Sequence, residues 1–453
     1  MRTTRALRKL RGSIHPQYFK GLTADCPIIS MPTPAKLYVS MAQHLGAPAK
    51  PIVAKGDTVI RGQCIAEANG FISAPVHAPV SGKILDVDTA PTPSGAMAPR
   101  IIIETDPANA DSSMMPPIPD WAEQPRETLL ARIAEAGIAG MGGAGFPTRV
   151  KLSPPADKPI DTLIINGAEC EPYLTADHRL MVEQSKAITD GIRIICHILQ
   201  AKAVHVAIED NKPEAIEAMQ NALRQLDGVD ATVCILPTEY PQGAEKQQIA
   251  VTTGREVPSG GLPMDVGCVV ENVGTVLALA NAILRGEPLT HRVTTVTGHI
   301  VNKPQNVLAP IGTTYADLVA FCDGLATPAA KVISGGPMMG MAQPSMDVST
   351  TKTSSGLVLL EEKRVHLYRA LPCIGCGRCI EACPMDLIPA AISYTVEGGD
   401  LDRAEALNIL DCIECGCCAF VCPSARPLVQ HFKLAKPKII VKRRQAAAAK
   451  GKA

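Results

Sequence analysis

The sequence predicts a multidomain α/β chain in which a flattened β-barrel, an α/β domain, a small strand-rich insert and a helical cysteine-rich domain follow one another. Three patterns support this order. They are β-rich runs broken by Gly-Asp and Ser-Gly turns near the N-terminus, alternating strand and helix patterns in the middle, and a repeated cysteine spacing near the C-terminus. At 453 residues the chain is too long for one core, so three or four domains are expected.

Changes in composition divide the chain into six expected segments. They are a basic N-terminal segment (1–27), a barrel (28–110), an α/β domain (120–289), a small β domain (290–350), a cysteine-rich domain (360–430) and a basic tail (431–453). The stretch Pro91–Pro119 is rich in Pro, Ser, Ala and Met, and it predicts a loop or linker between the barrel and the α/β domain.

The barrel is predicted from the short runs in Lys55–Gln63 and Ala74–Ile84. These runs resemble the flattened barrel of biotinyl and lipoyl carrier domains, in which a lysine at a hairpin tip bears the swinging cofactor. The corresponding tip here, Glu67–Phe71, contains no lysine. We therefore expect a docking module and not a covalently loaded carrier.

The next two domains follow from the length and composition of the apolar runs. Thr162–Asn166 and Val204–Ile208 read as strands and Pro213–Leu226 reads as a helix, a succession typical of a parallel sheet. Val293–Gly298 and Lys331–Pro337 then indicate a compact strand-rich insert, similar to a β-grasp-like (SLBB) domain. Short helices are expected at Leu387–Val396 and Asp402–Ile409, between the two cysteine runs.

The two cysteine runs share one spacing. The first reads Cys373-x2-Cys376-x2-Cys379-x3-Cys383-Pro384, and the second reads Cys412-x2-Cys415-x2-Cys418-x3-Cys422-Pro423. This spacing resembles that of bacterial two-cluster ferredoxins, in which three close thiolates hold one [4Fe–4S] cluster and the fourth ligates the other cluster. The expected ligand sets are Cys373, Cys376, Cys379 and Cys422 for one cluster, and Cys412, Cys415, Cys418 and Cys383 for its neighbour.

Two alternatives accompany this interpretation. Zinc also takes four cysteines, but its sites usually use separated pairs and not three thiolates within seven residues. Cys417 is a ninth cysteine inside the second run, where it breaks no spacing and is expected to be a small buried thiol. The runs thus favour one-electron transfer over a zinc-stabilised scaffold.

Composition excludes some functions. Aromatic residues make up only 3%, which argues against a nucleic-acid binder built on stacked bases, and 44 basic residues balance 44 acidic ones. Neither a signal peptide nor a run of eighteen apolar residues is visible, so we expect no transmembrane segment. Thiolate ligands and scattered cysteines indicate a reducing, cytoplasmic compartment. The basic ends are equally compatible with an anionic surface and with simple solvation.

A glycine-rich loop opens the α/β domain. Gly140–Thr148 contains G-x-G-x-x-G, but a helix pattern precedes it and Pro147 follows it, so it does not fit the usual dinucleotide fingerprint. Bare backbone N–H groups can still approach an anion or a flat ring closely.

The same loop closely resembles the G-R-G-G-A-G-F-P-T loop that cradles FMN in the flavin subunit of respiratory complex I. Asn166–Pro172, Tyr240–Lys246 and Glu271–Thr275 match three further segments of that family in the same order. The resemblance implies that FMN is bound by Gly140, Gly142, Gly143, Gly145, Lys151, Asn166, Asn272 and Thr275. It places Glu169, Glu171, Tyr240 and Glu245 near the flavin or NADH. Met141 replaces the family arginine, and Gln242 and Lys246 also depart from the pattern.

The order of the domains resembles the C subunit of the Rnf (Rsx) electron-transport complex over nearly the whole chain. That resemblance implies an enzyme subunit at the NADH site of a membrane ion-translocating ferredoxin:NAD⁺ oxidoreductase. It would carry FMN and two [4Fe–4S] clusters and use NAD(H) as substrate, and no acid–base catalytic residue is expected. The implied partners are other subunits of the complex, including an iron–sulfur subunit, and ferredoxin directly or indirectly. The implied location is the cytoplasmic face of the bacterial inner membrane.

Two other functions remain open at this point. A soluble NADH-dependent reductase of the cobalamin-reductase type would reuse the same domains, although the barrel precedes the clusters here. A non-catalytic iron–sulfur electron wire would have lost its flavin, which the four glycines, Lys151 and Asn166 argue against.

Overall fold

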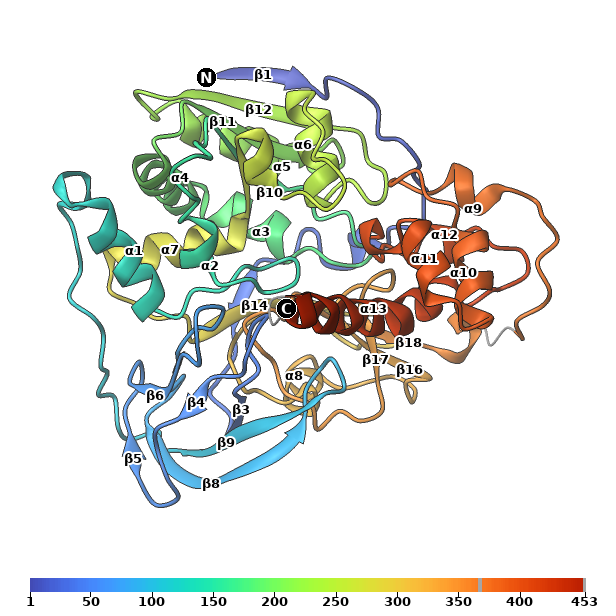
Figure 1. Cartoon of the computed structure of the whole chain (residues 1–453). Helices are drawn as coiled ribbons and strands as arrows, with labels where there is room; N and C mark the ends of the chain where they lie inside the picture. The colour runs from blue at the N-terminus through green and yellow to red at the C-terminus, as the bar shows by residue number, and fades with distance from the viewer. Residues whose placement is uncertain (366–368, 451–453) are drawn as a thin grey trace.

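The computed structural model describes residues 1–365 and 369–450, and the side chains up to residue 446. The last three residues of the predicted basic tail and the gap within the predicted cysteine-rich domain lie outside the described residues. Figure 1 shows the α/β domain at the upper left, the barrel below it, the strand-rich insert beside the barrel and the helical cysteine-rich domain at the right.

The barrel consists of two small antiparallel sheets, with strand orders β3-β9-β8-β5 and β4-β6-β7. Their bounds are Lys36–Ser40 (β3), Lys50–Pro51 (β4), Thr58–Val59 (β5), Cys64–Glu67 (β6), Val76–His77 (β7), Gly82–Pro91 (β8) and Met97–Thr105 (β9). Alternate side chains of these strands, such as Leu37, Ile84 and Ile101, are fully buried and form one core. The predicted hairpin tip lies between β6 and β7.

The loop predicted for Pro91–Pro119 is wrong in its first half. β9 lies inside that stretch and pairs with β8 over nine positions. Its Pro and Met residues suggested a linker, but Ile101 and Ile103 alternate with partly exposed neighbours and fill the barrel core. Burial of every second side chain in the barrel core thus decides the structure here, and the Pro- and Met-rich composition does not.

The α/β domain is built on a parallel five-stranded sheet, with order β1-β12-β11-β10-β13. Besides β1, its strands are Thr162–Gly167 (β10), Ala203–Glu209 (β11), Asp230–Leu236 (β12) and Cys268–Asn272 (β13). The helices are Arg126–Glu135 (α1), Thr148–Lys151 (α2), Ala176–Glu183 (α3), Ser185–Leu199 (α4), Pro213–Leu223 (α5), Glu245–Thr253 (α6) and Val273–Leu284 (α7). Both faces of the sheet are buried, one under α1, α3, α4, α5 and α7 and the other against α6, which explains the continuous apolar runs of its strands.

The N-terminal segment supplies strands to two other domains. Arg2–Arg5 (β1) joins the edge of the α/β sheet beside β12, and Ile28–Ser30 (β2) pairs with the strand-rich insert and not with the barrel. In Figure 1 the segment runs from the top edge of the molecule past the cysteine-rich domain toward the centre. A segment that reads only as basic in sequence therefore ties the domains together.

The insert is a six-stranded sheet of order β17-β16-β18-β14-β15-β2 covered by one helix. Its elements are His291–Thr297 (β14), Gln305–Pro310 (β15), Tyr315–Phe321 (α8), Lys331–Ser334 (β16), Met341–Gln343 (β17) and Gly356–Leu360 (β18). Val296, Leu318 and Leu357 are fully buried in its core.

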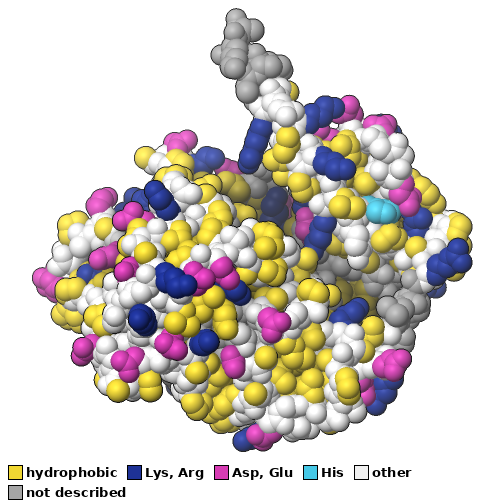
Figure 2. Space-filling model, turned by 90° about the horizontal axis from the view of Figure 1, so that it is seen from below, with side chains coloured by type: hydrophobic (Ala, Val, Ile, Leu, Met, Phe, Trp, Pro, Cys, Tyr) yellow, Lys and Arg dark blue, Asp and Glu magenta, His cyan; other side chains and the backbone are white. Residues whose placement is uncertain are grey.

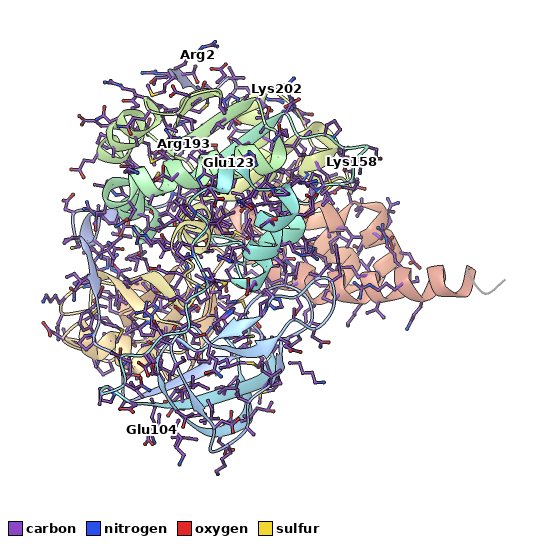
Figure 3. The ribbon with its side chains drawn as sticks, turned by 90° about the vertical axis from the view of Figure 1, so that its left-hand side faces the viewer. Arg2, Glu104, Glu123, Lys158, Arg193 and Lys202 are labelled. Atoms are coloured by element: carbon purple, nitrogen blue, oxygen red, sulfur yellow. The ribbon has the colours of Figure 1, made fainter. Side chains whose placement is uncertain are left out.

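The cysteine-rich domain is helical. Its helices are Arg378–Glu381 (α9), Pro389–Glu397 (α10), Leu401–Ala406 (α11), Cys417–Phe420 (α12) and Leu428–Lys450 (α13). α13 packs on α10 and α11 and then projects away from the body (Figure 3). Several of its basic groups are paired, because Lys436 bonds to Glu414 at 2.6 Å and Lys442 and Arg443 pair with Asp402 and Glu405.

None of the described helices combines the length and the apolar character needed to span a bilayer. On the face seen from below, basic and acidic side chains are interspersed with hydrophobic ones (Figure 2).

Candidate functional site

The glycine loop lies between α1 and α2 and is closed at its base, where Gly140 N–H donates to Phe146 O at 2.8 Å. Gly142 and Gly145 each have a φ of +72°, which favours glycine. A Cβ on Gly142 would lie 2.8 Å from Asn272 Nδ2, whereas a Cβ on Gly143 would meet nothing within 4 Å. The loop thus packs against the start of α7 on one side and leaves bare backbone exposed on the other.

The N-terminus of α7 stands directly behind this loop. Asn272 caps the helix by accepting from Gly274 N–H at 2.8 Å, and Thr275 Oγ1 accepts from Met141 N–H at 2.8 Å. The Asn272 amide also donates to Asp177 Oδ2 at 2.6 Å. A helix N-terminus carries partial positive charge, so the loop and the helix together favour an anionic group.

Lys151 and Glu245 form an ion pair of 2.7 Å at one side of the loop. Glu271 is completely buried nearby, and burial raises its pKa to about 7. Burial alone would lower the pKa of Lys151, but the carboxylates of Glu271 and Glu245 raise it. Lys151 therefore remains a cation beside the loop.

Asn166 lies next to the last residue of β10 and links this region to α6. Its Nδ2 donates to Gly243 O at 2.9 Å, and its Oδ1 accepts from Gln248 Nε2 at 2.8 Å. The asparagine therefore fixes the Gly243 turn relative to the carboxyl edge of the sheet, where ligands of parallel α/β sheets bind.

The two predicted acids of the following loop are held by backbone amides. Glu169 accepts from the N–H groups of Asp177 and His178 at 2.8 and 3.1 Å. Glu171 accepts from Met338 and Met339 at 3.0 and 2.7 Å, on a turn of the strand-rich insert, and burial raises its pKa to about 7. Glu171 thus connects the α/β domain to the insert.

Lys20 supports the same loop from the N-terminal segment, a contact that the sequence did not suggest. Its ammonium group donates to the carbonyls of Glu169, Glu171 and Leu174 at 2.7, 3.0 and 2.6 Å. Burial lowers the pKa of Lys20. The N-terminal segment thereby fixes the acidic loop in place.

Tyr240 lies at the boundary with the cysteine-rich domain. It is 1% exposed, and its hydroxyl donates to Cys415 O at 2.7 Å. Its backbone exchanges two hydrogen bonds with Ile14, of 2.9 and 3.0 Å. In this structure the tyrosine therefore contacts the second cysteine run, and its predicted place near the flavin or NADH stays a prediction.

The residues around the glycine loop fit an FMN nucleotide. The exposed backbone at Gly143 offers a flat, uncovered surface, and Lys151, Asn166 and the α7 N-terminus lie around it. These donors suit a phosphate and a ring carbonyl, and the glycine backbone suits a planar ring.

The cysteines line two separate cavities, four to each. One is lined by Cys383, Cys412, Cys415 and Cys418, here called the inner set. The other is lined by Cys373, Cys376, Cys379 and Cys422, the outer set. Each set combines three thiols of one run with the fourth of the other run. Four thiols in one cavity are the donor set that a [4Fe–4S] cluster takes. Among residues 1–365 and 369–450, no three such side chains lie close enough together to hold a single metal ion.

The two sets differ in their surroundings. Around the inner set, Gln247 Nε2 donates to Pro384 O at 2.6 Å, and Cys417 is fully buried with its Sγ 3.8 Å from Tyr240 O. A Cβ on Gly12 would lie 2.3 Å from Cys383 O. Around the outer set, Cys376 is exposed and Ile374 is 71% exposed. The inner set thus lies against the α/β domain, and the outer set faces solvent.

Comparisons with known proteins agree with this domain order. Family models match the RnfC barrel sandwich hybrid domain at residues 8–108, the Nuo51 FMN-binding domain at 133–281, the SLBB domain at 293–342 and a 4Fe-4S dicluster domain at 372–425. The chain is 48% identical over 431 residues to the C subunit of the proton-translocating ferredoxin:NAD(+) oxidoreductase complex of Clostridium ljungdahlii, covering 95% of this chain and 94% of the relative. The chain belongs to the RnfC family.

Two other matches are a second C subunit and a solved structure. The C subunit of the Na(+)-translocating ferredoxin:NAD(+) oxidoreductase complex of Acetobacterium woodii is 42% identical over 96% of this chain and 98% of its own length. A crystal structure of an NAD⁺-reducing [NiFe]-hydrogenase has 17% identity and a TM-score of 0.49, over 72% of this chain and 68% of that one.

Membership in the RnfC family confirms the predicted fold class, the oxidoreductase function and the cofactors FMN and [4Fe–4S]. The chain is a subunit of a multi-subunit complex that is associated with a membrane. The zinc scaffold and the flavin-free wire are not supported. The domain boundaries and the roles of single residues stay predictions.

Proposed function

We propose that this chain accepts electrons from NADH at the exposed side of the glycine loop and delivers them to a partner iron–sulfur subunit at the outer set. FMN supplies the step from a two-electron hydride to single electrons when it is bound. The observation that carries the proposal is the placement of the inner set against the α/β domain, with the outer set beyond it. Electron flow in the opposite direction would use the same order.

The inner set is the expected first station because three contacts hold it to the α/β domain. The Tyr240 hydroxyl donates to Cys415 O, and the Gln247 amide donates to Pro384 O. In the third contact, Asp411 accepts from Ser259 Oγ and, at 3.2 Å, from Gly260 N–H. Fixed separation matters here, because electron transfer weakens steeply when cofactors drift apart. We expect the side chains at this contact to set the rate of internal transfer.

The barrel is proposed to form one wall of the nucleotide site. Leu45 N–H donates to Gly145 O at 2.9 Å, so the barrel is attached directly to the glycine loop. Phe71, on the hairpin tip that bears lysine in carrier domains, is 69% exposed and lies under the Arg149 guanidinium at 5.6 Å. An aromatic face beside a cation suits the stacked ring and pyrophosphate of a dinucleotide.

The outer set is proposed as the partner contact. Exposed apolar side chains lie around it, namely Leu371, Ile374, Ile380 and Tyr394. Apolar patches on a soluble domain mark interaction sites. Ile374→Asp should slow electron delivery to the partner subunit while NADH still reduces the clusters of this chain. Met97→Asp, at a barrel residue that is 63% exposed, is the matched control.

We further propose that the subunit lies on the cytoplasmic face of the membrane, where NADH is available. Ferredoxin would reach it directly or through the partner. Protease treatment of inverted and right-side-out vesicles tests the location, because only inverted vesicles should expose the chain.

The central experiment is an anaerobic visible and EPR titration of the FMN-reconstituted chain with NADH. Bleaching of the flavin followed by reduced [4Fe–4S] signals would support the whole path within this subunit. Clusters that respond to dithionite but never to NADH would overturn it.

A further inference from the structure

Arg292 is a buried cation with unsatisfied donors. The side chain comes from β14 and is 3% exposed, and its Nε and Nη2 groups have no hydrogen-bond partner among the described residues. A guanidinium keeps its charge at physiological pH and presents five N–H donors. Leaving such donors unpaired in a buried site costs free energy. The arrangement therefore suits a bound hydrogen-bond acceptor.

The two acids that attract Arg292 already serve other donors. Asp177 Oδ2 accepts from Asn272 Nδ2, and Glu169 accepts from the backbone N–H groups of Asp177 and His178. Burial also raises the pKa of Asp177 to about 6, with the charge of Glu169 adding to the shift. The two acids thus attract Arg292 electrostatically without accepting hydrogen bonds from its Nε and Nη2 groups, which are left free for a ligand.

Arg292 lines a cavity between three domains. The barrel contributes Arg61, the segment after it contributes Met114, α7 contributes Leu277, and the insert contributes Leu308. The cavity has a volume of about 400 Å³, within the roughly 300–1,000 Å³ of small-molecule sites. Its lining mixes apolar side chains with two guanidinium groups, those of Arg61 and Arg292, and one carboxylate, that of Glu287. The two guanidinium groups suit a ligand that has an anionic end.

The cavity meets the flavin loop at Met141 and Gly274, which both line it. A Cβ on Gly274 would lie 3.1 Å from Arg292 Nη1 and 3.1 Å from Met141 Sδ. Both side chains therefore lie next to Gly274, at the first turn of α7. This helix has twelve residues, and its N-terminus favours anions. Met141 stands where the loop that it resembles has an arginine. Arg292 brings a guanidinium next to Met141 from β14.

We propose that Arg292 binds the phosphate of the flavin nucleotide at the first turn of α7 and so supplies the positive charge that Met141 lacks. This inference rests on the proposed function, because it takes the glycine loop as the flavin site. It assigns a strand of the insert to the flavin site, in addition to the α/β domain. It also predicts selectivity for FMN over riboflavin, which has no phosphate.

The test measures binding of FMN and of riboflavin to the full chain with its clusters assembled, by quenching of flavin fluorescence. Arg292→Gln should weaken FMN binding roughly 10- to 100-fold, the usual effect of losing a charged hydrogen bond, and should leave riboflavin binding unchanged. Arg292→Lys should recover part of the preference. Arg61→Gln removes an exposed charge from the same cavity and should change the FMN-to-riboflavin ratio less than threefold. Cluster absorbance and the melting temperature report whether each variant folds.

Three results bear on the proposal. A lower ratio in Arg292→Gln and its partial recovery in Arg292→Lys support it. An unchanged FMN-to-riboflavin ratio in Arg292→Gln overturns it. Binding of inorganic phosphate to the FMN-loaded chain, if it depends on Arg292, also overturns it, because the anion site would then be separate from the flavin. If the wild-type chain binds no flavin at all, the proposed function fails first, and the two failures are distinguishable.

Discussion

Tyr240→Phe separates a role at the nucleotide from a role at the inner set. The substitution keeps the buried ring and removes only the hydroxyl that donates to Cys415 O at 2.7 Å. The carbonyl of Cys415 would then lose this partner in a buried position, which costs about 1–3 kcal/mol. Since Cys415 and its neighbours hold the inner set, the loss should fall on the cluster domain and its contact with the α/β domain.

Two measurements should respond differently. Thermal loss of cluster absorbance should begin several degrees lower, because about 1 kcal/mol shifts the midpoint of a domain below 100 residues by roughly 4–8 °C. In anaerobic stopped-flow mixing, reduction of the clusters by NADH should slow. The KM for NADH with ferricyanide, an artificial acceptor, should stay within about twofold of wild type.

Tyr315→Phe provides the matched control. Tyr315 is also 1% exposed, and its hydroxyl bonds to Ser334 Oγ at 2.6 Å inside the strand-rich insert. This variant should destabilise the insert without changing cluster reduction. If Tyr240→Phe instead raised the KM for NADH fivefold or more and left the clusters intact, the tyrosine would act at the nucleotide and the reasoning would fail.

Three further predictions use other contacts. Cys383→Ser should abolish the EPR signal of the inner set, and Cys422→Ser that of the outer set; the reverse pattern would refute the crossed ligation. Glu271→Gln should stabilise the chain at pH 8 by about 3 kcal/mol, but little at pH 5. The pKa of Glu271 is raised to about 7 in the folded chain, so folding becomes less favourable as the pH rises from 4.5 through 7. Equal gains at both pH values would contradict this. Lys20→Met removes three hydrogen bonds from the 169–174 loop, so the backbone amides of this loop should exchange hydrogen faster. Unchanged protection of these amides would disprove the role of Lys20 in fixing the loop.

Local patterns predicted the elements well where one short-range signal dominated. The cysteine spacing and its resemblance to two-cluster ferredoxins predicted two ligand sets, and the same two sets line two cavities of the structure. Strands such as Thr162–Gly167 (β10) and helices such as Pro213–Leu223 (α5) follow the apolar periodicity of their segments. For the strands and helices, the information lies within a few consecutive residues.

Long-range contacts were not visible in the sequence. Glu171 and Tyr240 were placed near the nucleotide by resemblance, but their polar groups bond to the insert and to the cysteine-rich domain. Lys20 is only one basic residue in a basic segment, and Arg292 is only an arginine near the start of a strand, so neither gave a local signal. The residues that accept from Lys20, and the acids that attract Arg292, lie more than 100 positions away in the chain, and periodicity does not report such contacts.

The path of the N-terminal segment has a consequence for synthesis of the chain. β1 and β2, made first, pair with β12 and β15, more than 200 residues later in the chain. On a ribosome adding about 5–20 residues per second, these early strands wait for many seconds before their neighbours emerge. Pairing over such separations slows folding and leaves strand edges uncovered meanwhile. The closing of the α/β sheet, with the flavin loop fixed against it, is therefore expected to be a late event, after most of the chain has left the ribosome.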